Sequence, residues 1–167
     1  MSPRVLVAGI GNVFLSDDAF GVEVVARLSG KDLPAGVRVE DFGIRGIHLA
    51  YELLNGYDAL VLVDAVPMGE SPGTLAVIEP SLDGSDIGRD QPAAVDAHTM
   101  SPDVVLATLS RLGGAVARVV IVGCQPADLG EGMGLSPAVA HAVDAAADLC
   151  AEVVIDIVRS AERSVHP

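Results

Sequence analysis

The sequence predicts an α/β protein, a three-layer α/β/α sandwich around a mainly parallel, twisted sheet of about five strands. Two features of the sequence predict this class. Short, unbroken apolar runs rich in Val, Ala and Leu recur along the chain, as is typical of strands buried on both faces of a parallel sheet. Segments with apolar residues at helical spacing separate these runs, which is the pattern of βαβ units. We find no internal repeat and no second domain, so residues 1–167 are expected to form a single domain.

The first strand is expected at Val5–Ala8, an apolar run bounded by Gly9. Gly9 and Gly11 then allow a tight turn with positive φ angles. The polar residues 16–18 follow, and apolar residues at positions 20, 24, 25 and 28 give the spacing of one helix face. Residues 16–18 therefore lie where an N-cap belongs. The sequence predicts a buried strand, a glycine loop and a helix whose start carries two carboxylates.

Four further segments read as strands. They are 37–41, 59–63, 73–79 and 117–122, and we expect the third of these at a sheet edge. Helices are expected over 47–54, from 101 to 112, and from 136 to about 159. The last helix repeats an acidic residue every four positions, which we interpret as a solvated face. The polar stretch 80–97 is expected to be a mobile surface loop that delivers His98.

Composition excludes several classes of partner. A net charge of −13 argues against nucleic acid and against an anionic membrane surface. Aromatic residues make up 3% of the chain, which disfavours a base-stacking platform. No apolar run approaches the roughly 18 residues of a membrane span, and the N-terminus lacks a signal-peptide pattern. Two cysteines without a CxxC pair favour a reducing compartment, and we expect the protein to be cytoplasmic.

The glycine loop allows three interpretations. Gly9 and Gly11 after a strand form half of a dinucleotide-binding fingerprint, but the third glycine would fall at Phe14, and two aspartates would repel a pyrophosphate. Alternatively, Asp17 and Asp18 cap the helix, which would explain one carboxylate and leave the other without a role. The third interpretation makes Asp18 a ligand for a cation at the edge of the sheet.

Polar side chains follow the strands at the edge where ligands gather in open α/β sheets. Asp18 comes after the first strand, Asp41 ends the second and Asp64 ends the third. His98 arrives on the long loop, and Gln125 follows the last strand. Two carboxylates and one imidazole would make an open site for a divalent cation such as nickel, zinc or iron. Each of these residues also has a structural interpretation, as a strand terminator, a cap or a loop residue.

Other reactive residue types are expected to be structural. His48 is interpreted as a surface or packing residue of a helix. Cys124, after the last strand, is interpreted as a small buried thiol and not as a nucleophile. No Gly-x-Ser-x-Gly motif is present, so the chain lacks the motif that carries the nucleophilic serine of a serine-hydrolase triad.

Four stretches of the chain resemble one protein family. They are GIGNVFLSDDAFGVEV, LVDAVPMGESPGTLAV, DAHTMSP and VGCQPADLGEGMGLSPAV, and together they cover nearly the whole chain. The chain is similar in these stretches to the maturation proteases of nickel–iron hydrogenases, which remove a C-terminal extension from the large-subunit precursor after nickel insertion. The resemblance implies that Asp18, Asp64 and His98 contact nickel carried by the substrate and act in catalysis, with Asp41 a further candidate. The resemblance also implies that the partner of this protein is the large-subunit precursor of a nickel–iron hydrogenase.

The chain differs from the pattern of the family in two places. The family often has Glu at the position of Asp18, which is one methylene shorter. It has an Asp-Gly-Gly-Thr turn where this chain has residues 41–46, DFGIRG, so a role for a turn hydroxyl is in doubt and Arg45 becomes a candidate for substrate contact. Hydrolysis could use a metal-activated water or a carboxylate base. The alternatives are a small-molecule or nucleotide-binding module that uses the Gly9-Gly11 loop, and a metallohydrolase with its own metal.

Overall fold

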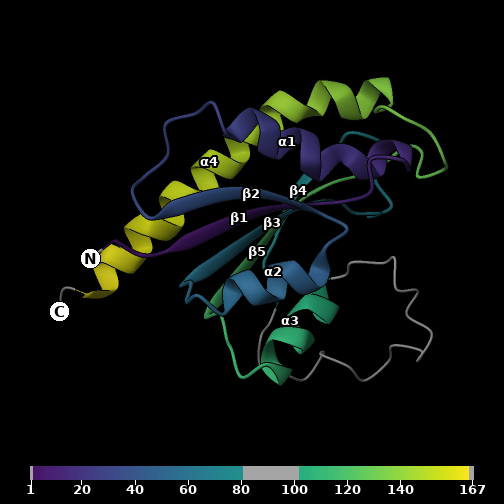
Figure 1. Cartoon of the computed structure of the whole chain (residues 1–167). Coiled ribbons are helices and arrows are strands. Elements are labelled where there is room, and N and C mark those ends of the chain that lie inside the picture. The colour runs from purple at the N-terminus through teal and green to yellow at the C-terminus, as the bar shows by residue number, and fades with distance from the viewer. Residues whose placement is uncertain (1, 81–101, 166–167) are drawn as a thin grey trace.

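The structure is a computed structural model that describes residues 2–80 and 102–165 (Figure 1). Within these ranges five strands form one sheet in the spatial order β2-β1-β3-β5-β4. The strands are β1 (Val5–Ile10), β2 (Val37–Gly43), β3 (Ala59–Ala65), β4 (Leu75–Ile78) and β5 (Arg118–Cys124). All neighbouring pairs are parallel except β4 and β5, which are antiparallel. The predicted sheet and the edge position of its fourth strand are confirmed.

Helices cover both faces of the sheet. A short 3-10 helix, η1 (Ser16–Ala19), leads into α1 (Phe20–Leu28), which packs with α4 (Pro137–Val165) on one face. α2 (Gly46–Leu53) and α3 (Pro102–Arg111) pack together on the other face (Figure 1). The α/β/α layers are those that the sequence predicts. The last helix is longer than predicted, because it continues past Arg159 to Val165.

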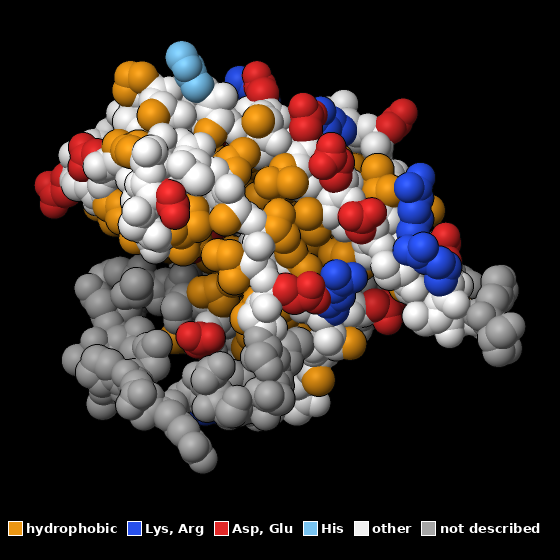
Figure 2. All heavy atoms as spheres, turned by 180° about the vertical axis from the view of Figure 1, so that it is seen from behind, with side chains coloured by type: hydrophobic (Ala, Val, Ile, Leu, Met, Phe, Trp, Pro, Cys, Tyr) orange, Lys and Arg blue, Asp and Glu red, His pale blue; other side chains and the backbone are white. Residues whose placement is uncertain are grey.

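The central strands β1, β3 and β5 are largely apolar because the sheet is buried there on both faces. All six residues of β1 are buried, with Val5 and Val7 facing the α1 and α4 layer and Leu6 and Ala8 facing the α2 and α3 layer. Alternating side chains of one strand therefore enter two separate cores. From behind (Figure 2), hydrophobic side chains gather across the middle of the molecule with charged side chains around them. Among the described residues no helix has the length and apolarity that a membrane crossing needs.

The acidic stripe of α4 is solvated, as predicted. Its four carboxylates are exposed, and two of them pair with the α1 side of the molecule. Arg27 Nη1 lies 2.6 Å from Asp144 Oδ1, and Lys31 Nζ lies 2.7 Å from Asp148 Oδ1. Exposed pairs of this kind contribute about 0–1 kcal/mol. The buried face of α4, which includes Cys150, carries the packing instead.

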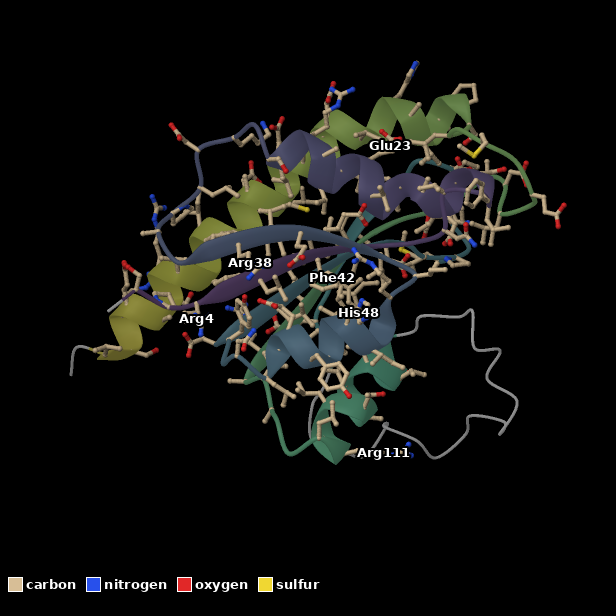
Figure 3. The ribbon with its side chains drawn as sticks, viewed as in Figure 1. Arg4, Glu23, Arg38, Phe42, His48 and Arg111 are labelled. Atoms are coloured by element: carbon tan, nitrogen blue, oxygen red, sulfur yellow. The ribbon has the colours of Figure 1, made fainter. Side chains whose placement is uncertain are left out.

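The strand order defines where a ligand can bind. The chain leaves β1 toward the β2 edge and leaves β3 toward the other edge, so the connections diverge between these two neighbouring strands. In open α/β sheets, such a divergence opens a crevice beyond the carboxyl ends of the strands. Asp18 follows β1 after the glycine loop, and Asp64 is the next-to-last residue of β3. The end of β2 closes one side of this crevice. Figure 3 shows Phe42 there, between the sheet and α2.

Candidate active site

A pocket of about 490 Å³ lies at the diverging ends of β1 and β3. Asp18 and Asp64 both line it, so the structure brings these two predicted residues together. Asp103, from the first turn of α3, is a third carboxylate in its wall. The described lining contains no Lys or Arg. The pocket is therefore electronegative in its polar part.

Strand register places Asp64. β1 and β3 pair in parallel up to Gly9 and Val63, and Asp64 is the first residue beyond that pair. It still pairs with Gly123 of β5, so its backbone remains part of the sheet. Its side chain is half-buried at the pocket wall. A carboxylate is thus held rigidly by the centre of the sheet.

The glycine loop places Asp18. Gly11 has φ +141°, and a Cβ at this position would lie 1.8 Å from the backbone oxygen of Asp18. Only glycine allows the loop to come this close. The backbone N–H of Asn12 donates to Asp18 Oδ2 over 2.7 Å. The loop and the carboxylate therefore form one unit, and one oxygen of Asp18 is oriented by the backbone.

A second glycine contact holds α1 against the strands. A Cβ on Gly21 would lie 2.2 Å from the carbonyl oxygen of Val63 and 2.4 Å from that of Ile10. The helix that follows Asp18 therefore lies directly on the ends of β1 and β3. This contact sets the position of Asp18 relative to Asp64.

Electrostatics distinguish Asp64 from an ordinary surface carboxyl. Burial raises the pKa of Asp64 well above its usual value of 3.8, and the negative charge of Asp18 raises it further. A hydrogen bond from the Ala65 backbone acts in the opposite direction and is the smallest of the three effects. Ionisation of Asp64 beside the charged Asp18 costs free energy when no cation is near. A cation at the pocket would relieve both causes.

Asp17 has a structural role that the sequence analysis did not predict. It is fully buried, and its carboxylate accepts backbone N–H groups of Ala127, Asp128 and Ser136 at 2.8, 3.0 and 2.7 Å. The Ser136 hydroxyl donates to it over 2.8 Å. Burial alone would raise the pKa of Asp17, but these hydrogen bonds lower it overall. Asp17 anchors the loop between β5 and α4.

The prediction that residues 16–18 cap the first helix was wrong. They form η1, a 3-10 turn, and neither η1 nor α1 has a side-chain capping hydrogen bond. The reason is tertiary: the buried carboxylate of Asp17 bonds to a loop 110 or more residues away, and that of Asp18 turns back to the glycine loop. Both are therefore unavailable as caps.

Asp41 and Gln125 bond to the backbone near them. Asp41 is exposed, its Oδ1 accepts the N–H of Gly43 over 2.8 Å, and it is not among the described lining of the pocket. Gln125 Oε1 accepts the backbone N–H groups of Met68 and Glu70, which fixes the segment after β3. Arg45 also bonds to its own turn, with Nη2 donating to the Asp41 carbonyl over 2.6 Å.

His98 and the predicted loop 80–97, apart from Pro80, lie outside the described residues, and so does Ser101. Within the described part of the chain, no group of three or more His, Cys, Asp or Glu residues could hold a metal ion. Asp18 and Asp64 are therefore two carboxylates of a site whose third predicted ligand is not described. The sequence analysis missed Asp103, although its place in the first turn of a helix after the long loop was visible.

The cysteines and the described histidines are structural or solvated, as predicted. Cys124 and Cys150 are buried free thiols. Burial raises the pKa of Cys124 to about 11 and that of Cys150 to about 12, so neither is an activated nucleophile. His48 and His141 are exposed.

The glycine loop has few free donors. The N–H of Gly11 donates to the Gly43 carbonyl over 2.9 Å, and that of Asn12 is bonded to Asp18. The N–H groups of Phe14 and Leu15 both donate to Asn12, at 2.9 and 3.1 Å. A phosphate-binding loop needs such groups to point at the ligand. The loop is built to hold a carboxylate.

Comparison with known proteins agrees with the resemblance seen in the sequence. The model of the hydrogenase maturation protease family HycI matches residues 22–153. The chain belongs to the hydrogenase maturation protease family. It is 39% identical over 148 residues to the hydrogenase expression/formation protein HupD of Rhodobacter capsulatus, covering 84% of this chain. It spans 66% of the length of that relative.

Solved structures of maturation proteases share the fold. The hydrogenase maturating endopeptidase HybD from E. coli superposes with a TM-score of 0.72 at 28% identity, covering 92% of this chain and 93% of HybD. A hydrogenase 2 maturation peptidase from a Thaumarchaeota archaeon gives 0.69 at 35% identity, covering 90% and 97%. The α/β sandwich of this chain is therefore that of the maturation proteases.

Proposed function

We propose that this chain is an endopeptidase that removes the C-terminal extension of a nickel–iron hydrogenase large-subunit precursor after nickel insertion. The observation that carries the proposal is the pocket at the diverging strand ends, whose wall places Asp18 and Asp64 together. Membership of the maturation protease family supports the reaction class. The two buried free thiols are compatible with a reducing cytoplasm, where we place the reaction.

Nickel in this proposal belongs to the substrate. Asp18, Asp64 and His98 contact a nickel ion that is already seated in the precursor. The raised pKa of Asp64 supports this role, because a half-buried carboxyl beside a second carboxylate gains more from a nearby cation than an exposed one does. Docking on the metal then sets the scissile bond beside the pocket, and the precursor without nickel lacks that contact.

Two routes of hydrolysis fit the proposal. In one, the nickel of the substrate would activate a bound water as the nucleophile that attacks the peptide carbonyl, and the released proton would pass to the leaving amine. In the other, a carboxylate takes the proton of the attacking water, and Asp64 is the candidate base because its raised pKa makes it a stronger base than an ordinary aspartate. In both, the C–N bond breaks and the leaving amine takes up a proton.

The test is the intact mass of the cognate large-subunit precursor before and after incubation with this protein. Nickel-loaded and nickel-free precursor are compared side by side. We expect loss of a C-terminal peptide from the loaded form alone. Cleavage of both forms would keep the protease and remove nickel from the recognition. Cleavage of neither would overturn the proposal.

Variants distinguish the loss of a contact in the site from a general effect of substitution on the protein. Asp64→Asn and His98→Ala should abolish processing, since each removes a proposed contact to nickel. Asp144→Asn is the matched control, because it makes the same change at an exposed position on α4, on the α1 side of the sheet. Processing at the wild-type rate by both site variants would show that the metal contacts are wrongly assigned.

A further inference from the structure

We propose that Phe14 and Met133 form a docking surface for the folded body of the large-subunit precursor, outside the pocket and independent of nickel. The inference rests on the proposed function and names where on this chain that partner binds. The two residues lie on different connections, one between β1 and α1 and the other between β5 and α4. We call them the Phe14–Met133 surface.

Both side chains of this surface are large, apolar and exposed to solvent. Met133 is 73% exposed and Phe14 is 65% exposed, and neither is in the described lining of the pocket. Neighbouring exposed apolar side chains are typical of interaction sites, and aromatic residues and methionine are enriched at protein–protein interfaces. The chemistry of the surface therefore points to a protein partner.

Backbone hydrogen bonds join the two connections. The N–H of Gly132 donates to the Phe14 carbonyl over 2.9 Å, and the N–H of Ser16 donates to the Gly132 carbonyl over 3.0 Å. Leu15 and Gly132 thus form a parallel bridge. On its other side, Phe14 donates its own N–H to Asn12 Oδ1 over 2.9 Å. Because the backbone is held before a partner binds, the entropy cost of association is lower than for free loops.

The surface is continuous with the pocket along both connections. Asp18 lies on the same connection as Phe14, and Leu129, on the same connection as Met133, also lines the pocket. The Asp17 carboxylate ties the two connections together through its bonds to residues 127, 128 and 136. A protein that brings its metal to Asp18 is therefore brought to this surface as well.

The size of the pocket requires protein contacts beyond it. At about 490 Å³ it has the volume of a small-ligand site. A stable protein–protein contact covers about 800 Å² on each partner. A folded precursor that presents its nickel to Asp18 and Asp64 therefore rests on the surface around the pocket, and the Phe14–Met133 surface flanks the Asp18 side.

Charge favours the precursor over two other occupants. The chain carries a net charge of −13, so two copies repel each other, and so does an anionic membrane. The exposed side chain of Glu131, two residues before Met133, adds to this repulsion locally. The precursor is the partner that the pocket itself places beside this surface.

The test compares processing kinetics of three variants on the nickel-loaded precursor. Phe14→Ser and Met133→Ser remove exposed apolar side chains without adding charge, so both should keep the wild-type Tm. We expect each to raise KM about ten-fold or more with kcat within two-fold of wild type, as when a central interface contact is lost. Val165→Ser is the matched control: Val165 is 72% exposed at the far end of α4 from this connection (Figure 1).

A second arm measures binding without turnover. The nickel-free precursor offers no metal to the pocket, so isothermal titration calorimetry reports the remaining contacts alone. We expect the wild-type protein and Val165→Ser to bind it equally, and Phe14→Ser and Met133→Ser to bind it about ten-fold or more weakly. Equal Kd values for all four proteins would overturn the inference, because the surface would then contribute nothing to binding of the folded body.

The outcomes separate the two proposals. Wild-type KM for Phe14→Ser and Met133→Ser, or an equal rise for Val165→Ser, would overturn this inference and leave the protease intact. A wild-type dimer in size-exclusion chromatography that both substitutions dissociate would assign the surface to a second copy and would also overturn it. Failure of the wild-type protein to cleave any nickel-loaded precursor would overturn the proposed function and this inference with it.

Discussion

Adjacent aspartates in η1 have opposite environments. Asp17 is fully buried and accepts four hydrogen bonds from one loop, whereas Asp18 is half-buried at the pocket with one oxygen bonded to Asn12. The first side chain holds the loop between β5 and α4, and the second lines the pocket. Substitutions at the two positions should therefore give different phenotypes.

Asp17→Ala should destabilise the protein by about 3 kcal/mol or more, since it removes four hydrogen bonds to a charged group, and such bonds contribute about 1.5–3 kcal/mol each. Urea unfolding followed by circular dichroism measures the change. Asp144→Ala is the control, because its ion pair with Arg27 is exposed and is worth about 1 kcal/mol or less. An Asp17→Ala variant as stable as this control would show that Asp17 does not anchor the loop.

Asp64→Asn should raise the Tm at neutral pH while it abolishes processing. The folded pKa of Asp64 lies above its usual value of 3.8, so the folded protein holds a proton that the unfolded chain releases. Stability therefore falls as pH rises through this window, and the cost is complete above the folded pKa. Asparagine removes that cost.

The pH dependence makes this prediction specific. The Tm difference between Asp64→Asn and wild type should be close to zero below pH 3.8, grow with rising pH and then level off. Each 1 kcal/mol gained corresponds to roughly 2–4 °C for a domain of this size. A variant that is less stable than wild type at neutral pH would contradict the assigned cause of the shift.

At the scale of elements, the contact of α1 with the sheet controls the site. Gly21 lets the helix backbone touch the carbonyls of Val63 and Ile10, and the same strands end beside Asp18 and Asp64. The obstacles around Gly21 are backbone atoms, which cannot move aside as a flexible side chain can. The seating of one helix and the spacing of two carboxylates are thus coupled.

Gly21→Ala should destabilise the protein by about 1–3 kcal/mol or more, because overpacking here displaces α1. Processing should fall as well, since Asp18 moves with the helix. Gly30→Ala is the matched control: its Cβ would meet only the Arg27 carbonyl at 3.8 Å. Thermal melts and precursor cleavage are measured on both variants. Wild-type behaviour of Gly21→Ala would show that α1 can shift without effect on the site.

At the scale of the whole molecule, topology brings the site together. The order β2-β1-β3-β5-β4 makes the chain diverge after β1 and β3, and the four helices described lie in two layers that leave the carboxyl ends of these strands accessible. The same arrangement in other proteins binds nucleotides. Here the loop donors are bonded to Asp18, Gly43 and Asn12.

Nucleotides should therefore not stabilise this protein. Addition of ATP or NAD at millimolar concentration should leave the Tm unchanged, whereas a ligand at 100 times its Kd would add about 2.7 kcal/mol of stability. Differential scanning fluorimetry measures the shift. A rise of several degrees with either compound would favour a nucleotide-binding module over a protease.

Much of the fold and part of the site follow from the sequence. The apolar runs of β1, β3 and β5 require burial on both faces, and helical spacing between them supplies the covering layers. Since parallel strands end at one edge, Asp18 and Asp64 were predicted to meet, and both line the pocket. Periodicity and strand direction are local properties, so a sequence displays them.

Tertiary structure alone decided the roles of individual side chains at that edge. Asp17 and Asp18 are equivalent in the sequence, yet one is held by a loop 110 residues away. Asp41 bonds to its own turn, while Asp103 joins the pocket from the first turn of α3 and Ile44 and Leu129 join it from two connections. Contacts between distant segments determine these roles, because hydrogen bonding and burial depend on which loops fold together and not on spacing along the chain.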